Sequence, residues 1–440
     1  MESIEEMVPW LFLLVSLWGA LFTWNVYRPT YRPAALATLS FFAGWLTAEL
    51  AMHHIAVQLV ATLIFVWAGA LAAWPGWLGL FVTVASWAAL YRSHARAREA
   101  EDAMERALAE ALGPDYRTHV PEDLGDRLAV ALDWRRWALP FRIRHPEVER
   151  VRNVEYFGSG KSRLLLDVYH HRARPAGCPV LLQIHGGAWV LGSKDEQGLP
   201  LMNHLAARGW VCVSINYRLS PRATFPDPLV DVKRAIAWIR EHAAEYGGDP
   251  TFLIVTGGSA GGHLCALTAL TANDPEYQPG FEHVDTSVAG CVAFYGVYDF
   301  TDRHRQYRNR GLARLLERRV MKVPYTTGRE AWERASPLSR VCDTAPPFLV
   351  VHGDRDTLVP VEEARHFVTA LRARTQAPVA YAEIPGAQHA FEIFPSLRAA
   401  LVVHGVERFV TYLYARARGT TARCDDQAAA AAPAPASLAR

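Results

Sequence analysis

The chain has 440 residues, which is more than one ordinary domain needs. Its net charge of +2 argues against nucleic-acid binding, and its six cysteines show neither a CxxC pair nor metal-ligand spacing, so they predict buried thiols. The hydrophobic content of 51% is high for a soluble protein, and much of the apolar excess, with eight of the 14 Trp, precedes Tyr91.

Residues 1–91 predict a helical membrane region. The uncharged apolar run at 8–26 is long enough to cross a bilayer, which takes roughly 20 residues in a helix. Because the N-terminus is acidic and apolar segments recur, this run is typical of an anchor rather than a cleaved signal peptide. Further candidates lie at 34–50, 55–73 and 77–91, the last being short for a full span. We therefore expect three or four transmembrane segments.

Arginines flank this region at both ends. Arg28 and Arg32 follow the first segment, and Arg92, Arg96 and Arg98 follow the last. The positive-inside rule places both groups in the cytoplasm, which three spans satisfy and four do not. The arginines therefore favour a multi-pass protein whose C-terminal part is cytoplasmic.

Residues 92–150 predict a connector. Its charged, Ala-rich first part, 92–112, has the apolar spacing of an amphipathic helix, and Gly113-Pro114 ends it. The rest of the connector is irregular. At the other end of the chain, residues 419–440 include an Ala/Pro run without a core pattern, which predicts a disordered tail.

Between 151 and 418, short apolar runs alternate with helical periods. The pattern predicts strands at 164–169, 180–184, 211–215, 252–255, 292–295, 348–351 and 379–384, and helices at 229–246, 361–372 and 397–414. Such alternation indicates an α/β fold, with a mostly parallel sheet covered by helices on both faces. In these sheets the functional residues gather at the carboxyl ends of the strands.

An insertion at 300–335 follows the strand at 292–295 and could cap the site. It is strongly basic, with Arg303, Arg305, Arg308, Arg310, Arg314, Arg318, Arg319 and Lys322. Such a run could attract anionic lipid or an acidic substrate, or it could be a solvated helical face.

A G-x-S-x-G motif directly follows the strand at 252–255. It reads Gly257-Gly258-Ser259-Ala260-Gly261, and an apolar helix comes next. A strand, a sharp turn and a helix project a serine hydroxyl into the site, and the helix N-terminus favours negative charge there. We interpret Ser259 as a nucleophile.

A second Gly-rich motif, His185-Gly186-Gly187-Ala188-Trp189, follows the strand at 180–184. Glycines let backbone N–H groups approach the oxyanion of an acyl-transfer transition state. The candidate oxyanion donors are therefore the N–H groups of Gly186, Gly187 and Ala260. His185 is interpreted as a structural hydrogen-bonding residue, and Trp189 either walls the acyl pocket or packs in the core.

A serine nucleophile needs a base and an orienting acid, which follow it in the order acid, then His, in this type of fold. Asp354 and Asp356 both lie in the loop after the strand at 348–351, and we choose Asp356. His389 follows the last strand and is the candidate base, whereas His352 belongs to the acid loop.

Residues 180–414 resemble the hormone-sensitive-lipase-like branch of the α/β-hydrolases. The resemblance rests on His185-Gly186-Gly187, on SINYRLSP at 214–221, on Phe225-Pro226 through Asp231, on Gly258 to Gly262, and on Gly353, Asp356 and Leu358. It supports Asp356 as the acid and implies ester hydrolysis without a metal or cofactor. Ala188-Trp189 departs from the usual pattern and looks closer to relatives acting on acetyl esters, feruloyl esters or formamides.

The expected function is therefore that of a membrane-anchored serine esterase acting on lipophilic carboxylic esters of short to medium acyl length. Two alternatives stay open. One is amide, formamide or peptide hydrolysis on the same residues, and the other is a catalytically silent, membrane-anchored binding module. The sequence leaves the oligomeric state open.

Overall fold

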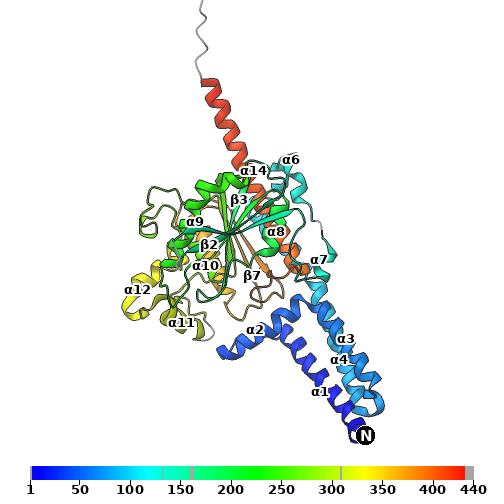
Figure 1. Ribbon diagram of the computed structural model, residues 1–440. Helices are drawn as coiled ribbons and strands as arrows, with labels where there is room; N and C mark the ends of the chain where they lie inside the picture. Colours follow the sequence, from blue (N-terminus) through cyan, green and yellow to red (C-terminus); the bar gives the residue numbers. More distant parts are fainter. Residues whose placement is uncertain (1, 131, 159–162, 308–309, 432–440) are drawn as a thin grey trace, which may run out of the picture.

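The computed structural model describes residues 2–130, 132–158, 163–307 and 310–431. Figure 1 shows an α/β domain from which two parts project, the N-terminal helices and the long C-terminal helix. The strands of the domain are β1 (Val148–Phe157), β2 (Leu164–His171), β3 (Cys178–Ile184), β4 (Val211–Ile215), β5 (Gly248–Gly258), β6 (Gly290–Phe294), β7 (Phe348–Gly353) and β8 (Val379–Ile384).

These strands form one sheet in the order β1-β2-β4-β3-β5-β6-β7-β8. β1 and β2 pair antiparallel, and so do β2 and β4, whereas every pair from β4 to β8 is parallel. The carboxyl ends of β3, β5, β7 and β8 therefore lie along the same edge of the sheet. The expected α/β class, with a mostly parallel sheet, is confirmed.

Helices cover both faces of the sheet, and each face has its own core. Val180 and Leu182 of β3 pack in the core under the helices α9, α10 and α13, whereas Leu181 faces the core under α5, α8 and α14. The alternation follows from the two-residue period of a strand. The helices of the domain are α8 (Leu199–Ala207), α9 (Asp227–His242), α10 (Ala260–Leu270), α11 (Gly311–Leu315), α12 (Tyr325–Arg334), α13 (Glu362–Arg374) and α14 (Leu397–Ala431).

The N-terminal region consists of α1 (Glu2–Tyr27), α2 (Ala34–Glu49), α3 (Ala51–Trp67) and α4 (Trp74–Arg96). Within the described residues, one helix, at 6–27, is long and apolar enough to cross a membrane. α2 and α3 meet that test only as a pair bent by 89°, as a broken span or a re-entrant segment would be. The structure thus supports fewer full spans than the three or four expected, because the second and third apolar segments fold as two short helices.

α1, α3 and α4 pack as a three-helix stalk. The ring centroids of Trp10 and Trp74 are 5.3 Å apart near the starts of α1 and α4, and the Tyr27 hydroxyl donates to the Ala89 carbonyl near their ends, at 2.6 Å. α1 and α4 therefore run parallel, and α3 returns between them.

α2 leaves the stalk and lies against the α/β domain. Its terminal residue, Glu49, is buried, accepts a hydrogen bond of 2.6 Å from the Ser396 hydroxyl and pairs with Arg398. Glu49, the one charged residue of the apolar segment at 34–50, is thus satisfied inside the protein.

The connector and the tail differ in part from the expectation. The amphipathic helix is α5 (Glu99–Leu112), which buries Met104 and Leu108 beside β8 and α14. Short helices α6 (Glu122–Gly125) and α7 (Trp134–Ala138) interrupt the irregular part. α14 continues to Ala431, past the start of the tail expected from residue 419, and residues 432–440 lie outside the described residues.

The insertion at 300–335 contains α11, a π-helix (Leu316–Met321) and α12. The Val320 carbonyl accepts a hydrogen bond of 3.1 Å from the Phe225 N–H, which ties the insertion to the loop before α9. Of the basic residues expected there, Arg308 lies outside the described residues.

Candidate active site

Ser259 stands at the turn between β5 and α10. Its backbone has φ 58° and ψ −119°, a strained conformation for a residue other than glycine. The turn is as tight as the motif predicts, because a Cβ on Gly261 would lie 2.1 Å from the Ile184 carbonyl oxygen. The Ser259 side chain is half-buried at the carboxyl edge of the sheet, beside the N-terminus of α10.

The Gly-rich loop after β3 lies next to this serine. A Cβ on Gly186 would be 3.2 Å from the Cβ of Ser259. The Gly186 N–H donates to the Gln197 side chain at 2.6 Å, so Gly186 is not an available oxyanion donor, contrary to the expectation. No hydrogen bond within the described residues uses the N–H of Gly187 or of Ala260, so both can donate to a substrate oxygen.

The candidate acid and the candidate base contact each other. His389 Nδ1 lies 2.6 Å from Asp356 Oδ2, and the N–H groups of Leu358 and Val359 each donate to Asp356 Oδ1 at 2.8 Å. Asp354 instead accepts a hydrogen bond from the Gly386 N–H, at 2.7 Å. The geometry thus favours Asp356 over Asp354 as the orienting acid.

A second histidine contacts the same carboxylate. His352 Nε2 is 3.2 Å from Asp356 Oδ2, and the His352 side chain is fully buried. Burial alone would raise the pKa of Asp356, but His389 and His352 outweigh burial and bring it below its usual range. Asp356 is therefore a carboxylate at neutral pH, as an orienting acid must be.

Tyr295 and Glu392 belong to the same site, and the sequence analysis missed them. The rings of Tyr295 and His389 lie 4.4 Å apart, and a Cβ on Gly258 would lie 2.6 Å from the Tyr295 hydroxyl. That hydroxyl donates to the buried Glu392 carboxylate. Tyr295 thus contacts both the turn that carries Ser259 and the ring of His389. The one signal in the sequence that could have found Tyr295 is its place just after β6, at the carboxyl edge of the sheet.

Trp189 packs in the core and does not wall an open pocket. It is 2% exposed, its Nε1–H donates to His263 Nδ1 at 3.2 Å, and its ring meets Phe300 edge-on at 5.1 Å. Burial lowers the pKa of His263 to about 4, so this imidazole is neutral and accepts the bond. Of the two interpretations left open for Trp189, the structure favours core packing.

His185 has the structural role expected of it. Its Nδ1 lies 2.7 Å from the Gly186 carbonyl, and its ring stacks on Tyr217 at 4.3 Å. Arg218, the next residue, binds Asp231 of α9 with nitrogen–oxygen distances of 2.8 to 3.1 Å. The motifs at 214–221 and 225–231 therefore hold the Gly-rich loop in place.

α2 reaches the site from the N-terminal region. The Phe41 ring meets the His389 ring edge-on at 6.0 Å, and the Thr357 hydroxyl donates to the Ala37 carbonyl at 3.1 Å. The residues that α2 contacts lie in two loops: Thr357 in the loop of the candidate acid and His389 in the loop of the candidate base. A helix of the N-terminal region is thus one wall of the site.

One cluster has the residue types of a metal site. His204 of α8 and His404 and Glu407 of α14 bring possible ligand atoms within 4.8 Å of one another. Arg208 Nε already lies 3.4 Å from Glu407 Oε1, and the hydrogen bonds of the two histidines outweigh burial and lower the pKa of Glu407 to about 2. Because Arg208 and the two histidines already satisfy this carboxylate, we interpret the cluster as a buried network of hydrogen bonds and ion pairs.

Two known esterases are similar in sequence to this chain over most of its length. The probable carboxylic ester hydrolase LipM of Mycobacterium tuberculosis is 42% identical over 425 residues, which are 92% of this chain and 93% of LipM. Esterase LipQ of the same organism is 39% identical and covers 89% of this chain and 90% of its own length. The chain belongs to the α/β-hydrolase esterases. Its function is therefore the hydrolysis of carboxylic esters.

Two further comparisons agree with this family. The sequence model of the BD-FAE family matches residues 166–371, which include Ser259 and Asp356. A truncated carbohydrate esterase from gut microbiota has the same fold, with a TM-score of 0.52 and 24% identity, over 60% of this chain and 96% of its own. The likeness to LipM, over 92% of this chain, extends into the N-terminal helices.

Proposed function

We propose that this esterase works through a triad of Ser259, His389 and Asp356. The observation that carries the proposal is the 2.6 Å contact between His389 and Asp356 at the same sheet edge as the strained Ser259. His389 takes the proton of the Ser259 hydroxyl as its oxygen attacks the ester carbonyl. The N–H groups of Gly187 and Ala260 receive the oxyanion.

The second half of the reaction follows from the same groups. His389, now protonated, gives its proton to the departing alcohol, and an acyl ester remains on Ser259. His389 then takes a proton from water, whose oxygen attacks the acyl carbonyl. The bond from the Ser259 oxygen to the acyl carbon breaks, His389 returns the proton to that oxygen, and the acid is released. Gly186 shapes the loop, since its N–H is held by Gln197.

The first test is Ser259→Ala. The variant should lose hydrolysis of p-nitrophenyl butyrate and labelling by a fluorophosphonate probe, while its thermal unfolding midpoint stays near that of the parent. Ser287→Ala is the matched control, because Ser287 precedes β6, at the opposite edge of the sheet, and should retain full activity. Undiminished labelling of Ser259→Ala would refute the assignment.

The proposed substrates are lipophilic esters of short to medium acyl length, taken at a membrane surface. α1 is apolar enough to anchor the chain, and its last turn reaches the domain where Arg355 donates to the Val26 carbonyl. α2 presents Phe41 to His389 and exposes Leu39 and Phe42, at 64% and 55%. An apolar surface thus continues from the stalk to the candidate site.

We further propose that the anchor is multi-pass and that the catalytic domain is cytoplasmic. The parallel course of α1 and α4 supports this topology, because it brings Arg28 and Arg96 to the same end of the stalk as the domain. Cationic residues at membrane boundaries favour the cytoplasmic side.

A further inference from the structure

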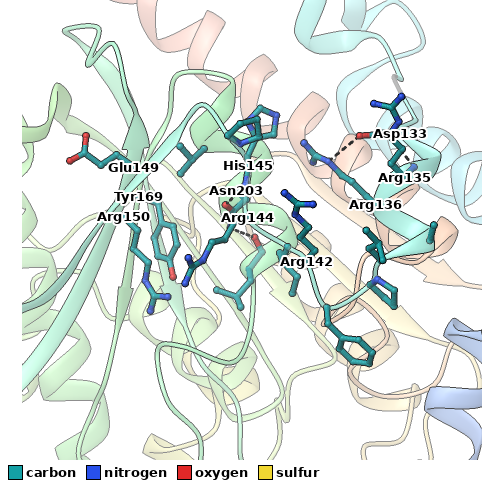
Figure 2. A pocket seen from close by; sticks show the side chains of 18 of the residues that line it. Asp133, Arg135, Arg136, Arg142, Arg144, His145, Glu149, Arg150, Tyr169 and Asn203 are labelled. Carbon is teal, nitrogen blue, oxygen red and sulfur yellow. Dashed lines mark hydrogen bonds and ion pairs between the residues drawn. The ribbon is translucent and has the colours of Figure 1, made fainter.

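A large basic cleft lies outside the candidate active site. It has a volume of about 2000 Å³ and lies between residues 133–146, the edge strands β1 and β2, and the start of α8 (Figure 2). Two acidic residues line it, Asp133 and Glu149, against seven arginines: Arg135, Arg136, Arg142, Arg144, Arg150, Arg152 and Arg172.

The two acidic residues do not neutralise the cleft. Asp133 lies 3.7 Å from Arg136, and Glu149 lies 3.5 Å from Arg174, which is not among the lining residues. Of the lining arginines, Arg150 is paired in the interior, with the buried Asp167. The net positive charge of the cleft therefore comes from the lining arginines other than Arg150.

Three of these arginines have exposed guanidinium groups. Arg142, Arg144 and Arg152 are exposed, and the part of the chain that the structure describes gives none of them an acidic partner. Guanidinium groups present several N–H donors in a plane, a geometry that matches phosphate and carboxylate oxygens. Three guanidinium groups of like charge in one cleft favour an anion there.

A buried hydroxyl points to a ligand independently of the charge. The Tyr169 side chain is 3% exposed and lines the cleft, yet its hydroxyl has no hydrogen-bond partner among the described residues. Figure 2 shows Tyr169 flanked by the side chains of Arg150 and Arg144. Burial raises the pKa of Tyr169 to about 12, so the hydroxyl keeps its proton and can donate it to a ligand oxygen.

We propose that this cleft binds the phosphate of an anionic phospholipid headgroup, through Arg142, Arg144 and the Tyr169 hydroxyl. The lipid source rests on the proposed membrane attachment, whereas the phosphate chemistry does not. One contact and two exposed apolar side chains favour a lipid. His53 of α3 lies 3.3 Å from the Ala138 carbonyl at the cleft, and Leu139 and Phe141 beside it are 54% and 77% exposed. Acyl chains can cover these side chains and the stalk while the phosphate enters the cleft.

The test is calorimetric titration of the full-length chain in dodecylmaltoside with dihexanoyl phosphatidylglycerol. The double variant Arg142→Gln, Arg144→Gln should raise the Kd at least about tenfold, and Tyr169→Phe about threefold. Arg318→Gln with Arg319→Gln is the matched control, because these exposed arginines of the insertion remove the same charge elsewhere. It should leave the Kd within about twofold.

The outcomes are separable. An unchanged Kd in the cleft variant, or an equal loss in the control variant, would overturn the proposal. Inorganic phosphate titrated alone should bind far more weakly than the lipid, and equal affinity would overturn the lipid as the source. Hydrolysis of p-nitrophenyl butyrate should be unaffected in the cleft variant, so that a failure of the triad and a failure of the cleft are distinguished.

Discussion

Asp356 contacts His389, whereas its neighbour Asp354 contacts the Gly386 N–H, and this difference can be measured. Asp356→Asn keeps the shape of the side chain but removes the charge that orients the imidazole and stabilises its protonated form. We expect kcat for p-nitrophenyl butyrate to fall by about 10⁴-fold, as in other triads. Asp354→Asn is the matched control and should change kcat by less than about threefold. Equal losses in the two variants would contradict the assignment of the acid.

The burial of Glu392 predicts how the stability of the protein depends on pH. Burial raises its pKa from the ordinary 4.5 to about 7, although the Tyr295 hydrogen bond works against the rise. The folded state therefore binds this proton more tightly than the unfolded state, and the contribution of Glu392 to the free energy of unfolding falls as pH rises from about 4.5 to 7.

Glu392→Gln tests this prediction, because the neutral amide cannot ionise. The thermal unfolding midpoint of the variant minus that of the parent should increase as the pH rises from 4.5 to 7. The increase should correspond to the ionisation of one buried carboxylate in the parent. Burial also raises the pKa of Glu363, to about 8, but Glu363 is present in both proteins and cancels in the comparison. Parallel curves for parent and variant would show that Glu392 does not titrate in this range.

At the scale of single residues, the candidate catalytic residues are those tied to a local motif in the sequence. Ser259, Asp356 and His389 each follow a predicted strand, so their meeting at one sheet edge was foreseeable. Gln197 was not, because its bond to the Gly186 N–H spans 11 residues without a motif. Tyr295 likewise depends on packing between β6 and the loop after β8, which no periodicity reveals.

α2 is the element whose role the sequence could least reveal. As an apolar segment it resembles a weak membrane span, and its docking depends on partners more than 300 residues away. The inner strands were easier to predict from the sequence, because strands buried on both faces are continuous apolar runs. β1 was missed, since this antiparallel edge strand carries charged residues on its exposed positions.

The contact of α2 with the site predicts an effect on acyl specificity. Phe41→Ala removes a ring that is 7% exposed and lies against His389, which opens space beside the base. The ratio of kcat/KM for p-nitrophenyl octanoate to that for the butyrate should rise several-fold, because each buried methylene contributes about 0.8 kcal/mol. Phe42→Ala is the control, since Phe42 is 55% exposed and its ring contacts Phe41 rather than His389. An unchanged ratio in the Phe41 variant would contradict α2 as a wall of the site.

On the scale of the whole molecule, the stalk fixes where the site can act. α2 and the stalk ends meet the carboxyl edge of the sheet, so the candidate triad and the exposed apolar helices lie at the same end of the domain (Figure 1). The basic cleft adjoins the start of α3 at His53. An esterase held this way would meet substrates that dissolve in the bilayer before those in bulk water.

The proposed topology predicts on which side of the membrane two positions of the chain lie. If α1, α3 and α4 each cross the membrane, the turn before α4 lies outside and the catalytic domain inside. A green fluorescent protein fused after Arg440 should therefore fluoresce, and an alkaline phosphatase fused there should be inactive. The matched fusions inserted after Ala73, in that turn, should give the opposite results. Cytoplasmic signals at both positions would mean that α2 and α3 form a re-entrant segment and that α4 does not cross the membrane either. Phosphatase activity after Arg440 would place the catalytic domain outside.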